Sequence, residues 1–156
     1  MFKYNYKKTS VILFMLLLML STENIFSKNK VGNATSSSSS EVVFSNKKWK
    51  DVMVEAKKSG KFIFVDAYTS WCGPCKLLKS TTFKDEKAAA CFNKNFINYS
   101  VDMEKGEGPA LAGKWNINAY PSLLFFNAKG EMVMKQVGYV NAETLVELGR
   151  QALLKK

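Results

Sequence analysis

The segment "KFIFVDAYTSWCGPCK", residues 61–76, decides the fold predicted for this chain. Its first half is β-branched and aromatic over the length of one strand, with Gly60 before it and two cysteines after it. We expect this half to be a buried central strand, followed by a helix from Cys72 to about Ser80. The pair Cys72 and Cys75 is therefore expected at the start of a helix.

The cysteine pair has three candidate roles: zinc ligand, structural staple or redox couple. A tetrahedral zinc site needs four ligands, usually Cys or His, whereas the chain has one further cysteine, Cys91, and no histidine. A structural disulfide gains stability by closing a long loop, but Cys72 and Cys75 enclose only two residues. The spacing favours redox chemistry, and we predict neither a metal nor a cofactor.

The position of the pair on the helix predicts different roles for the two sulfurs. At a helix N-terminus, Cys72 would face unpaired backbone N–H groups and the positive end of the helix dipole, which stabilise a thiolate. Cys75, one turn inside, would be close enough to attack a mixed disulfide. Pro74 suits the first turn, where its missing N–H costs no hydrogen bond, and Gly73 lets another chain approach closely. Cys72 is the predicted exposed nucleophile.

Patterns in the rest of the chain predict an alternation of strands and helices. A strand, a helix and a second strand in this order imply a parallel pair with a crossover. The expected elements are an edge strand over 42–44, a helix capped by Asn46 and ended by Gly60, a helix from near Asp85, a strand over 96–102, a short helix over 110–115, hairpin strands over 122–126 and 131–137 joined by 127–130, and a last helix capped by Asn141 with the apolar stripe Leu145, Leu148, Ala152 and Leu153.

The sequence "WCGPCK" (71–76) after "FIFVDAYTS" resembles the active-site segment of the thioredoxin family. The resemblance covers about residues 42–154 and is closest to the secreted bacterial branch related to the C-terminal domain of thiol:disulfide interchange proteins. It implies an α/β, thioredoxin-like fold, in which a central mixed β-sheet is flanked by helices. The activity it implies is thiol:disulfide oxidoreduction.

The resemblance assigns roles to residues outside the cysteine pair. Asp66 falls where the family keeps a buried acid beneath the resolving cysteine, and Tyr68 stands in place of the family's usual second aromatic. The lysine often paired with that acid is replaced near Ser100. The residues expected to bind substrate are Trp71, Gly73, Pro74, Tyr120, Pro121 and Gly138. Within "AYPSLLFF", Pro121 would be a cis proline facing the disulfide.

Simpler interpretations exist for several of these residues. Asp66 could end its strand in solvent, but it follows "FIFV" in a run expected to be buried, where an unpaired carboxylate is costly. A proton-transfer role with a raised pKa is therefore favoured. Trp71 and Tyr120 could be plain core aromatics, and for Tyr120 this alternative has equal weight. Cys91 lies in "AAACF", where a small buried residue is expected, so we predict that it is inert.

The N-terminal part of the chain predicts export. Lysines precede an uninterrupted apolar run of ten residues from Val11 to Leu20, and a polar stretch follows, which is the layout of a secretory signal. This run is half the ~20 residues of a membrane-spanning helix. We predict a signal peptide over 1–27 and a periplasmic or secreted protein, with an uncleaved membrane anchor as the alternative. Residues 28–41 contain five consecutive serines and predict a flexible tether, and 42–156 form the expected domain.

The charge of the chain is basic but dispersed. It has 23 Lys and Arg against 13 Asp and Glu, a formal net charge of +10. The lysines lie on several predicted elements, without an arginine cluster or a recognisable nucleic-acid-binding module. A solvated basic surface is favoured over a specific anionic partner. We predict a monomer with no nucleic-acid partner.

The functional hypothesis is a secreted enzyme that reduces protein disulfides through Cys72 and Cys75. Strong oxidants of this fold often carry a histidine between the cysteines; the chain has none, which favours a potential nearer the ~-270 mV of thioredoxin than the ~-120 mV extreme. A reductant outside the cytosol needs electrons, which implies a membrane electron-transporting thiol:disulfide interchange protein as donor. The alternatives are a disulfide oxidase or isomerase, and a binding module that holds other chains against Trp71 and Pro121.

Overall fold

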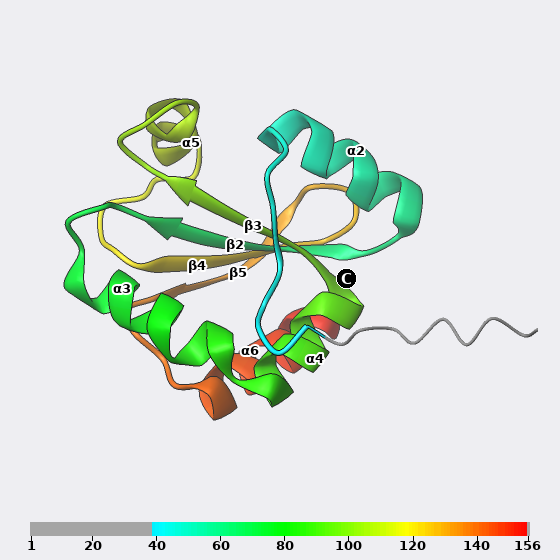
Figure 1. Cartoon of the computed structure of the whole chain (residues 1–156). Helices are drawn as coiled ribbons and strands as arrows, with labels where there is room; N and C mark the ends of the chain where they lie inside the picture. Colours follow the sequence, from blue (N-terminus) through cyan, green and yellow to red (C-terminus); the bar gives the residue numbers. More distant parts are fainter. Residues whose placement is uncertain (1–38, 156) are drawn as a thin grey trace, which may run out of the picture. The chain divides into compact units, whose positions relative to one another are not determined.

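A mixed five-stranded β-sheet forms the centre of the computed structural model, which describes residues 39–155 (Figure 1). The strand order is β1-β3-β2-β4-β5, with β1 and β2 parallel to β3, and with β4 antiparallel to both β2 and β5. The strands are β1 (Phe44–Ser45), β2 (Phe62–Tyr68), β3 (Phe96–Asp102), β4 (Ser122–Phe126) and β5 (Met132–Val137). The predicted signal peptide and nearly all of the predicted tether lie outside the described residues.

Helices cover both faces of the sheet, as the sequence predicts (Figure 1). One face carries α2 (Trp49–Ser59) and α5 (Gly108–Lys114), and the other carries α3 (Gly73–Ser80), α4 (Glu86–Asn95) and α6 (Ala142–Leu153). A 3₁₀ turn, η1 (Thr82–Lys84), follows α3. Within residues 39–155 no helix is both long and apolar enough to cross a membrane.

The central strand β2 divides the hydrophobic core into two clusters. Successive side chains of a strand point to opposite faces. Ile63, Val65 and Ala67 pack with α2 and α5, whereas Phe64 packs with α3, α4 and α6. All four are fully buried. Asp66 shares the face of Phe64, so its carboxyl group points toward the layer that contains α3.

The start of α2 differs from the prediction. The helix begins at Trp49 after Lys48, and no side chain of the preceding residue caps it, so the assignment of Asn46 as its cap is wrong. The backbone N–H of Trp49 donates instead to the Glu107 carboxylate, 2.8 Å away. An anionic group at a helix N-terminus is favourable, and this one comes from a residue distant in sequence that also accepts a hydrogen bond from Tyr99.

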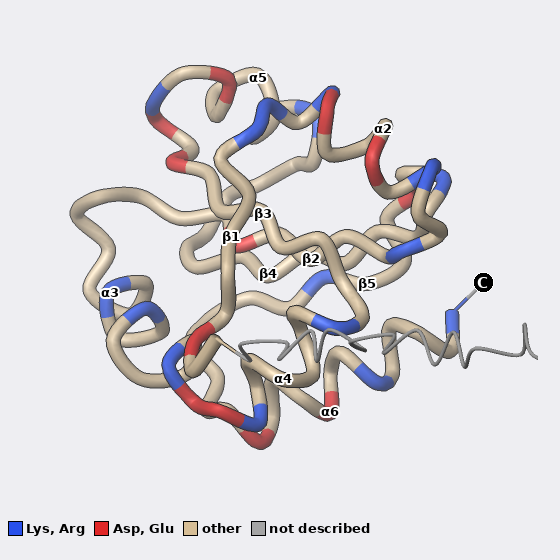
Figure 2. Tube along the Cα trace, turned by 45° about the vertical axis from the view of Figure 1, so that its right-hand side comes forward, with Lys and Arg blue, Asp and Glu red and all other residues tan. Residues whose placement is uncertain are grey.

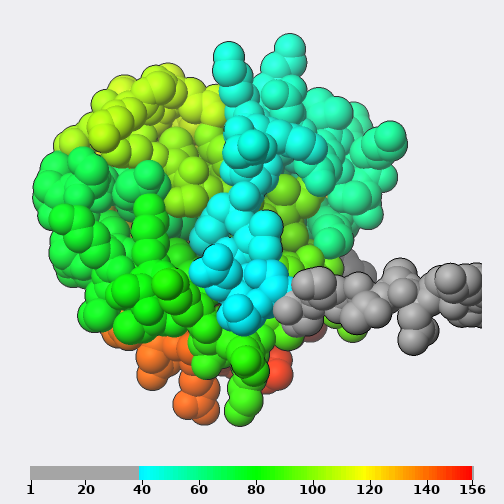
Figure 3. Space-filling view, viewed as in Figure 1, coloured from blue at the N-terminus to red at the C-terminus, as the bar shows by residue number. Residues whose placement is uncertain are grey.

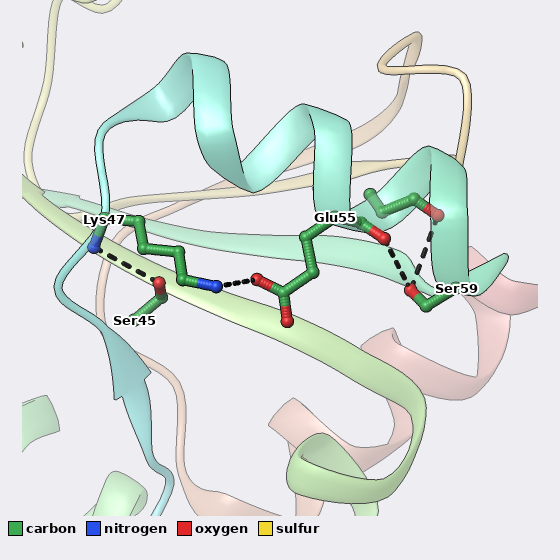
Figure 4. Close-up of polar contacts among 5 residues, drawn as sticks. Ser45, Lys47, Glu55 and Ser59 are labelled. Carbon is green, nitrogen blue, oxygen red and sulfur yellow. Dashed lines mark hydrogen bonds and ion pairs between the residues drawn. The ribbon is translucent and has the colours of Figure 1, made fainter.

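Side-chain contacts stabilise both ends of α2. Lys47, just before the helix, forms an ion pair of 2.8 Å with Glu55, and the Ser59 hydroxyl donates to the Glu55 carbonyl in the last turn (Figure 4). Gly60 ends the helix in a left-handed conformation with φ of 72°, as expected for a terminating glycine. The helix thus lies between a distant cap at its start and a local glycine at its end.

The first strand is displaced along the sequence from the predicted 42–44 to Phe44–Ser45. Its segment lies at the edge of the sheet and is exposed on the face shown in the space-filling view (Figure 3). Val43 is tied by side chains rather than by strand pairing, because its N–H donates to Asn93 and its carbonyl accepts from Asn98. These two contacts end the ladder before Phe44.

Helix α5 begins at Gly108, two residues before the expected start. A Cβ atom at Gly108 would overlap the carbonyl of Asp102, so the glycine lets the helix pack against the end of β3. The helix predicted from near Asp85 is α4, and the Asp85 side chain caps it. Asn141 caps α6 through the Thr144 N–H, as predicted. Basic and acidic positions are interspersed along the chain (Figure 2).

Candidate active site

The candidate active site lies where β2 passes into α3 (Figure 1). Cys72 is the N-cap of α3, and it forms a disulfide with Cys75 in the first helical turn, with 5.3 Å between their Cα atoms. Pro74 lies within the first turn, as predicted. The structure therefore places both cysteines at the N-terminus of a helix that follows the central strand.

The two sulfurs of the pair differ in their hydrogen bonding. The Cys75 N–H donates to Cys72 Sγ at 3.2 Å. In the reduced protein the same N–H group, at the positive end of the helix dipole, would face a Cys72 thiolate and stabilise it. The expected exposure of Cys72 is wrong for the disulfide form, in which Cys72 is 3% exposed and Cys75 is 1% exposed. The distinction between the cysteines thus rests on helix position.

Asp66 is fully buried on the face of the sheet that α3 covers. Ser100, its register partner on β3, donates a hydrogen bond of 2.9 Å to Asp66 Oδ2, while Oδ1 has no hydrogen-bond partner. Burial raises the pKa of Asp66 to about 6, against the opposing effects of the Lys79 charge and the Ser100 hydrogen bond. The acid expected to exchange protons near neutrality is therefore present, with serine at the predicted replacement position.

Trp71 forms the exposed side of the site. It is 64% exposed, so the interpretation as a core aromatic is wrong for this residue. Its indole N–H lies 3.0 Å from both carboxylate oxygens of Glu104, and its ring meets that of Tyr120 edge to face at 6.0 Å. Tyr120 is half-buried and also packs against the hydrophobic cluster on the face of the sheet that α2 and α5 cover. The two aromatic side chains therefore join the cysteine loop to the proline loop.

The proline loop at Pro121 lies against the turn at Gly138. The Tyr120–Pro121 peptide bond is cis, which confirms that expectation, and Pro121 is buried. The Gly138 N–H donates to the Pro121 carbonyl at 2.8 Å, and Gly138 has a φ of 95° that favours glycine. At Gly73, by contrast, a Cβ atom would meet nothing within 4 Å, so no contact within the described chain requires glycine there.

Two residues at the site escaped the sequence analysis. Glu104, which holds the Trp71 indole, follows β3 in an exposed loop and carries no local signal. Lys79 is one of the dispersed lysines for which a solvated surface is predicted, but its charge acts on Asp66, whose usual lysine partner is replaced near Ser100. The signal for Lys79 was its spacing, because it follows Cys75 by four residues and so shares a helix face with it.

Metal binding finds no support in the described part of the chain. No group of three or more His, Cys, Asp or Glu side chains there could hold a metal ion. Cys91 is a free, half-buried cysteine on α4, on the same side of the sheet as α3 but in a different helix. It takes no part in the Cys72–Cys75 disulfide.

Comparison with known proteins places this geometry among relatives. Residues 49–153 match the family model for thioredoxin-like domains. A proposed disulphide-isomerase from Bacteroides thetaiotaomicron, solved in solution, is 39% identical, with the match covering 74% of this chain and 96% of that one at a TM-score of 0.66. A thioredoxin from Thermus thermophilus shares the fold at 18% identity, with 68% and 84% covered and a TM-score of 0.62.

The curated relatives are longer proteins. The thiol:disulfide interchange protein DsbD of Colwellia psychrerythraea is 29% identical over 146 residues, which cover 88% of this chain and 24% of the relative. A protein disulfide-isomerase of Triticum aestivum is 34% identical over 89 residues, which cover 55% of this chain and 17% of the relative. The chain thus spans about a quarter or less of the length of these curated relatives.

Proposed function

Because the chain belongs to the thioredoxin-like family of thiol:disulfide oxidoreductases, we propose that it reduces disulfides in other proteins through Cys72 and Cys75. The observation that carries the proposal is the hydrogen bond from the Cys75 N–H to Cys72 Sγ at the start of α3. This donor would stabilise the thiolate of Cys72, and the thiolate is the nucleophile in disulfide exchange.

The proposed reaction proceeds in two exchange steps. The Cys72 thiolate attacks one sulfur of a substrate disulfide, which forms a mixed disulfide and releases the other substrate sulfur as a thiolate. Cys75 then gives its proton to the Asp66 carboxylate and attacks Cys72 Sγ. This second step releases the remaining substrate thiolate, which takes up a proton, and it closes the Cys72–Cys75 disulfide. Two electrons pass from the dithiol to the substrate.

Asp66 suits the role of proton acceptor because of its burial. A thiol within the protein is hard to ionise, since desolvation raises its pKa. A carboxyl group with a pKa of about 6 is largely ionised at neutral pH and is still a stronger base than an exposed aspartate. Asp66 also lies on the face of β2 that α3, the helix of Cys75, covers.

The substrate surface in this proposal surrounds the exposed indole of Trp71. Gly73 offers open space beside the disulfide, and Tyr120, Pro121 and the Gly138 turn lie on the neighbouring loops. An extended substrate segment would pass between the cysteine loop and the proline loop. The substrates we propose are disulfide-containing proteins rather than small ligands.

The direction and the location are further parts of the proposal. The intervening Gly73-Pro74 pair, without histidine, favours a low reduction potential. The apolar run of the N-terminal segment favours export to the periplasm or beyond. A reductant in such a compartment requires an electron donor, and a membrane protein of the DsbD type is the donor we propose.

Insulin reduction tests the activity. The chain should accelerate the precipitation of insulin by dithiothreitol, and a Cys72→Ser/Cys75→Ser variant should leave it at the rate of dithiothreitol alone, although it keeps the same surface. Equal activity of both would favour a binding module instead. The equilibrium reduction potential in dithiothreitol buffers tests the direction, because a value near that of the strong oxidants, ~-120 mV, would contradict a reductase.

Disulfide isomerisation is a second candidate, favoured by one observation. Two of the relatives, from Bacteroides thetaiotaomicron and Triticum aestivum, carry that description. Recovery of activity from scrambled ribonuclease separates the two functions, because an isomerase restores activity in a redox buffer whereas a reductase alone lowers the number of disulfides.

A further inference from the structure

The inner face of α3 carries a charged residue, Lys79, about one helical turn after Cys75. Residues three and four apart on a helix share a face, which places Cys75, Leu78 and Lys79 together. Cys75 and Leu78 are buried, and Lys79 is half-buried. A lysine at such a position extends its stem along the apolar layer between helix and sheet.

The sheet presents a polar strip to this helix face. Alternate residues of a strand share one face, and in the register of β2 with β3 Asp66 lies beside Ser100 and Tyr68 beside Asp102. The ammonium of Lys79 lies over the Tyr68 ring, 3.0 Å from its centroid. A cation over an aromatic face is attracted by the ring quadrupole. This contact holds the Lys79 charge above the strip that contains Asp66.

The charges around Asp66 identify Lys79 as its cationic neighbour. The ionisable groups near Asp66 are Lys79 on α3, Tyr68 on β2 and Asp102 at the end of β3. Asp102 also forms an ion pair of 3.4 Å with Lys105. The Lys79 charge lowers the pKa of Asp66, in opposition to burial. Burial in turn lowers the pKa of Lys79, and Asp66 and then Asp102 oppose that effect.

Within residues 39–155, Lys79 is the one cation whose charge acts on Asp66. Its Oδ2 accepts from Ser100, but its Oδ1 is buried without a hydrogen-bond partner. A buried carboxylate with one oxygen unsatisfied is costly to ionise unless a nearby cation stabilises it. Lys79 supplies that cation from the helix rather than from the sheet, where Ser100 provides only a hydroxyl.

We propose that Lys79 is a positioning residue for proton transfer: its ammonium, held over Tyr68, stabilises the Asp66 carboxylate and keeps it ready to accept the Cys75 proton. The inference rests on the proposed function of Asp66. In the second exchange step the proton passes from Cys75 Sγ to Asp66, while Lys79 remains charged and exchanges nothing. Lys79 thus acts through Asp66 and needs no contact with the substrate.

A carboxyl titration tests the electrostatic part without any activity assay. In the oxidised protein, the carboxyl carbon of Asp66, followed by NMR, should titrate with a midpoint near pH 6. Lys79→Met keeps the apolar stem and removes the charge, so the midpoint should move to higher pH. Lys79→Arg should keep the midpoint at its wild-type value, and so should Lys87→Met, which removes an exposed lysine from α4. An unmoved midpoint in Lys79→Met, and in Lys79→Gln as a second variant, would overturn the proposal.

The kinetic part uses the reduced protein with dithiobis(nitrobenzoate), in a Cys91→Ala background so that only the active pair reacts. Attack by Cys72 releases the first thionitrobenzoate and attack by Cys75 the second, so stopped flow resolves both steps. Near pH 6, Lys79→Met should slow the second release on the order of three- to tenfold, because less Asp66 is ionised. In an Asp66→Asn background, Lys79→Met should slow it no further.

The outcomes separate the two claims. Equal slowing by Lys79→Met with and without Asp66 would show that Lys79 acts on the thiols directly, which overturns the proposal. An unchanged second release in Asp66→Asn alone would overturn the proton-acceptor role within the proposed function. A normal Asp66→Asn effect with an unmoved midpoint in Lys79→Met would overturn the assignment of Lys79 alone.

Discussion

Asp66→Asn should increase the stability of the oxidised protein at neutral pH. The pKa of Asp66 is about 6 in the folded chain, against an ordinary value of 3.8. Between these two values the unfolded chain loses the proton while the folded chain retains it, so the free energy of unfolding falls as the pH rises. The difference corresponds to about 3 kcal/mol at 1.36 kcal/mol per pKa unit. Asparagine carries no charge and avoids this cost.

Denaturant unfolding of the wild type and of Asp66→Asn, measured at intervals from about pH 4 to about pH 8, tests this reasoning. The stability difference between the two proteins isolates Asp66 from other titrating groups. It should shift in favour of Asp66→Asn by about 3 kcal/mol between about pH 4 and about pH 6, and then reach a plateau. A difference that does not change with pH, or one that shrinks above pH 4, would refute the raised pKa.

Four variants, one of them again Asp66→Asn, test the mechanism and the fold. Cys72→Ser should abolish reduction, while Cys75→Ser should attack once and accumulate as a mixed disulfide detectable by mass spectrometry; faster alkylation of Cys75 than of Cys72 in the reduced protein would contradict this asymmetry. Asp66→Asn should slow release of the mixed disulfide by ~10²-fold or somewhat less and leave the first attack unchanged in single-turnover kinetics, and an unchanged release rate would make Asp66 purely structural. Gly108→Ala should lower the free energy of unfolding by about 1–3 kcal/mol, because its Cβ would overlap the carbonyl at the end of β3, whereas Gly113→Ala, where a Cβ meets nothing within 4 Å, is the control and should not.

The elements predicted best from the sequence are those whose signals are local. β2 is an apolar run bounded by glycine and cysteine, and α3, α4 and α6 begin at residues whose own side chains accept hydrogen bonds from the first turn. For such elements the determining contacts lie within a few positions along the chain. The cysteine pair, its helix and the burial of Asp66 on β2 could therefore be predicted from the sequence.

The misplaced features depend on residues far apart in sequence. Asn46 was assigned as the cap of α2 because it is a good local cap, but Glu107 supplies the acceptor from 58 positions away. Glu104 reaches Trp71 across 33 positions. Such contacts arise from the way strands align in the sheet, which local patterns do not specify. The exposure of Cys72 was overestimated for a similar reason, since helix position alone does not reveal what packs over a residue.

Asp66 connects the stability of the fold with the chemistry of the site. A hydrophobic side chain in place of Asp66 would suit the face it shares with Phe64, and the chain instead retains a carboxyl group with an unsatisfied oxygen. Two features moderate its cost, the hydroxyl of Ser100 and the charge of Lys79, and each lowers the pKa of Asp66 without cancelling the effect of burial. A fully balanced ion pair would leave a weak base, and an isolated carboxylate would stay protonated at neutral pH. The intermediate arrangement keeps a carboxyl group that can be ionised at neutral pH and can still accept a proton, which is what the resolving step requires.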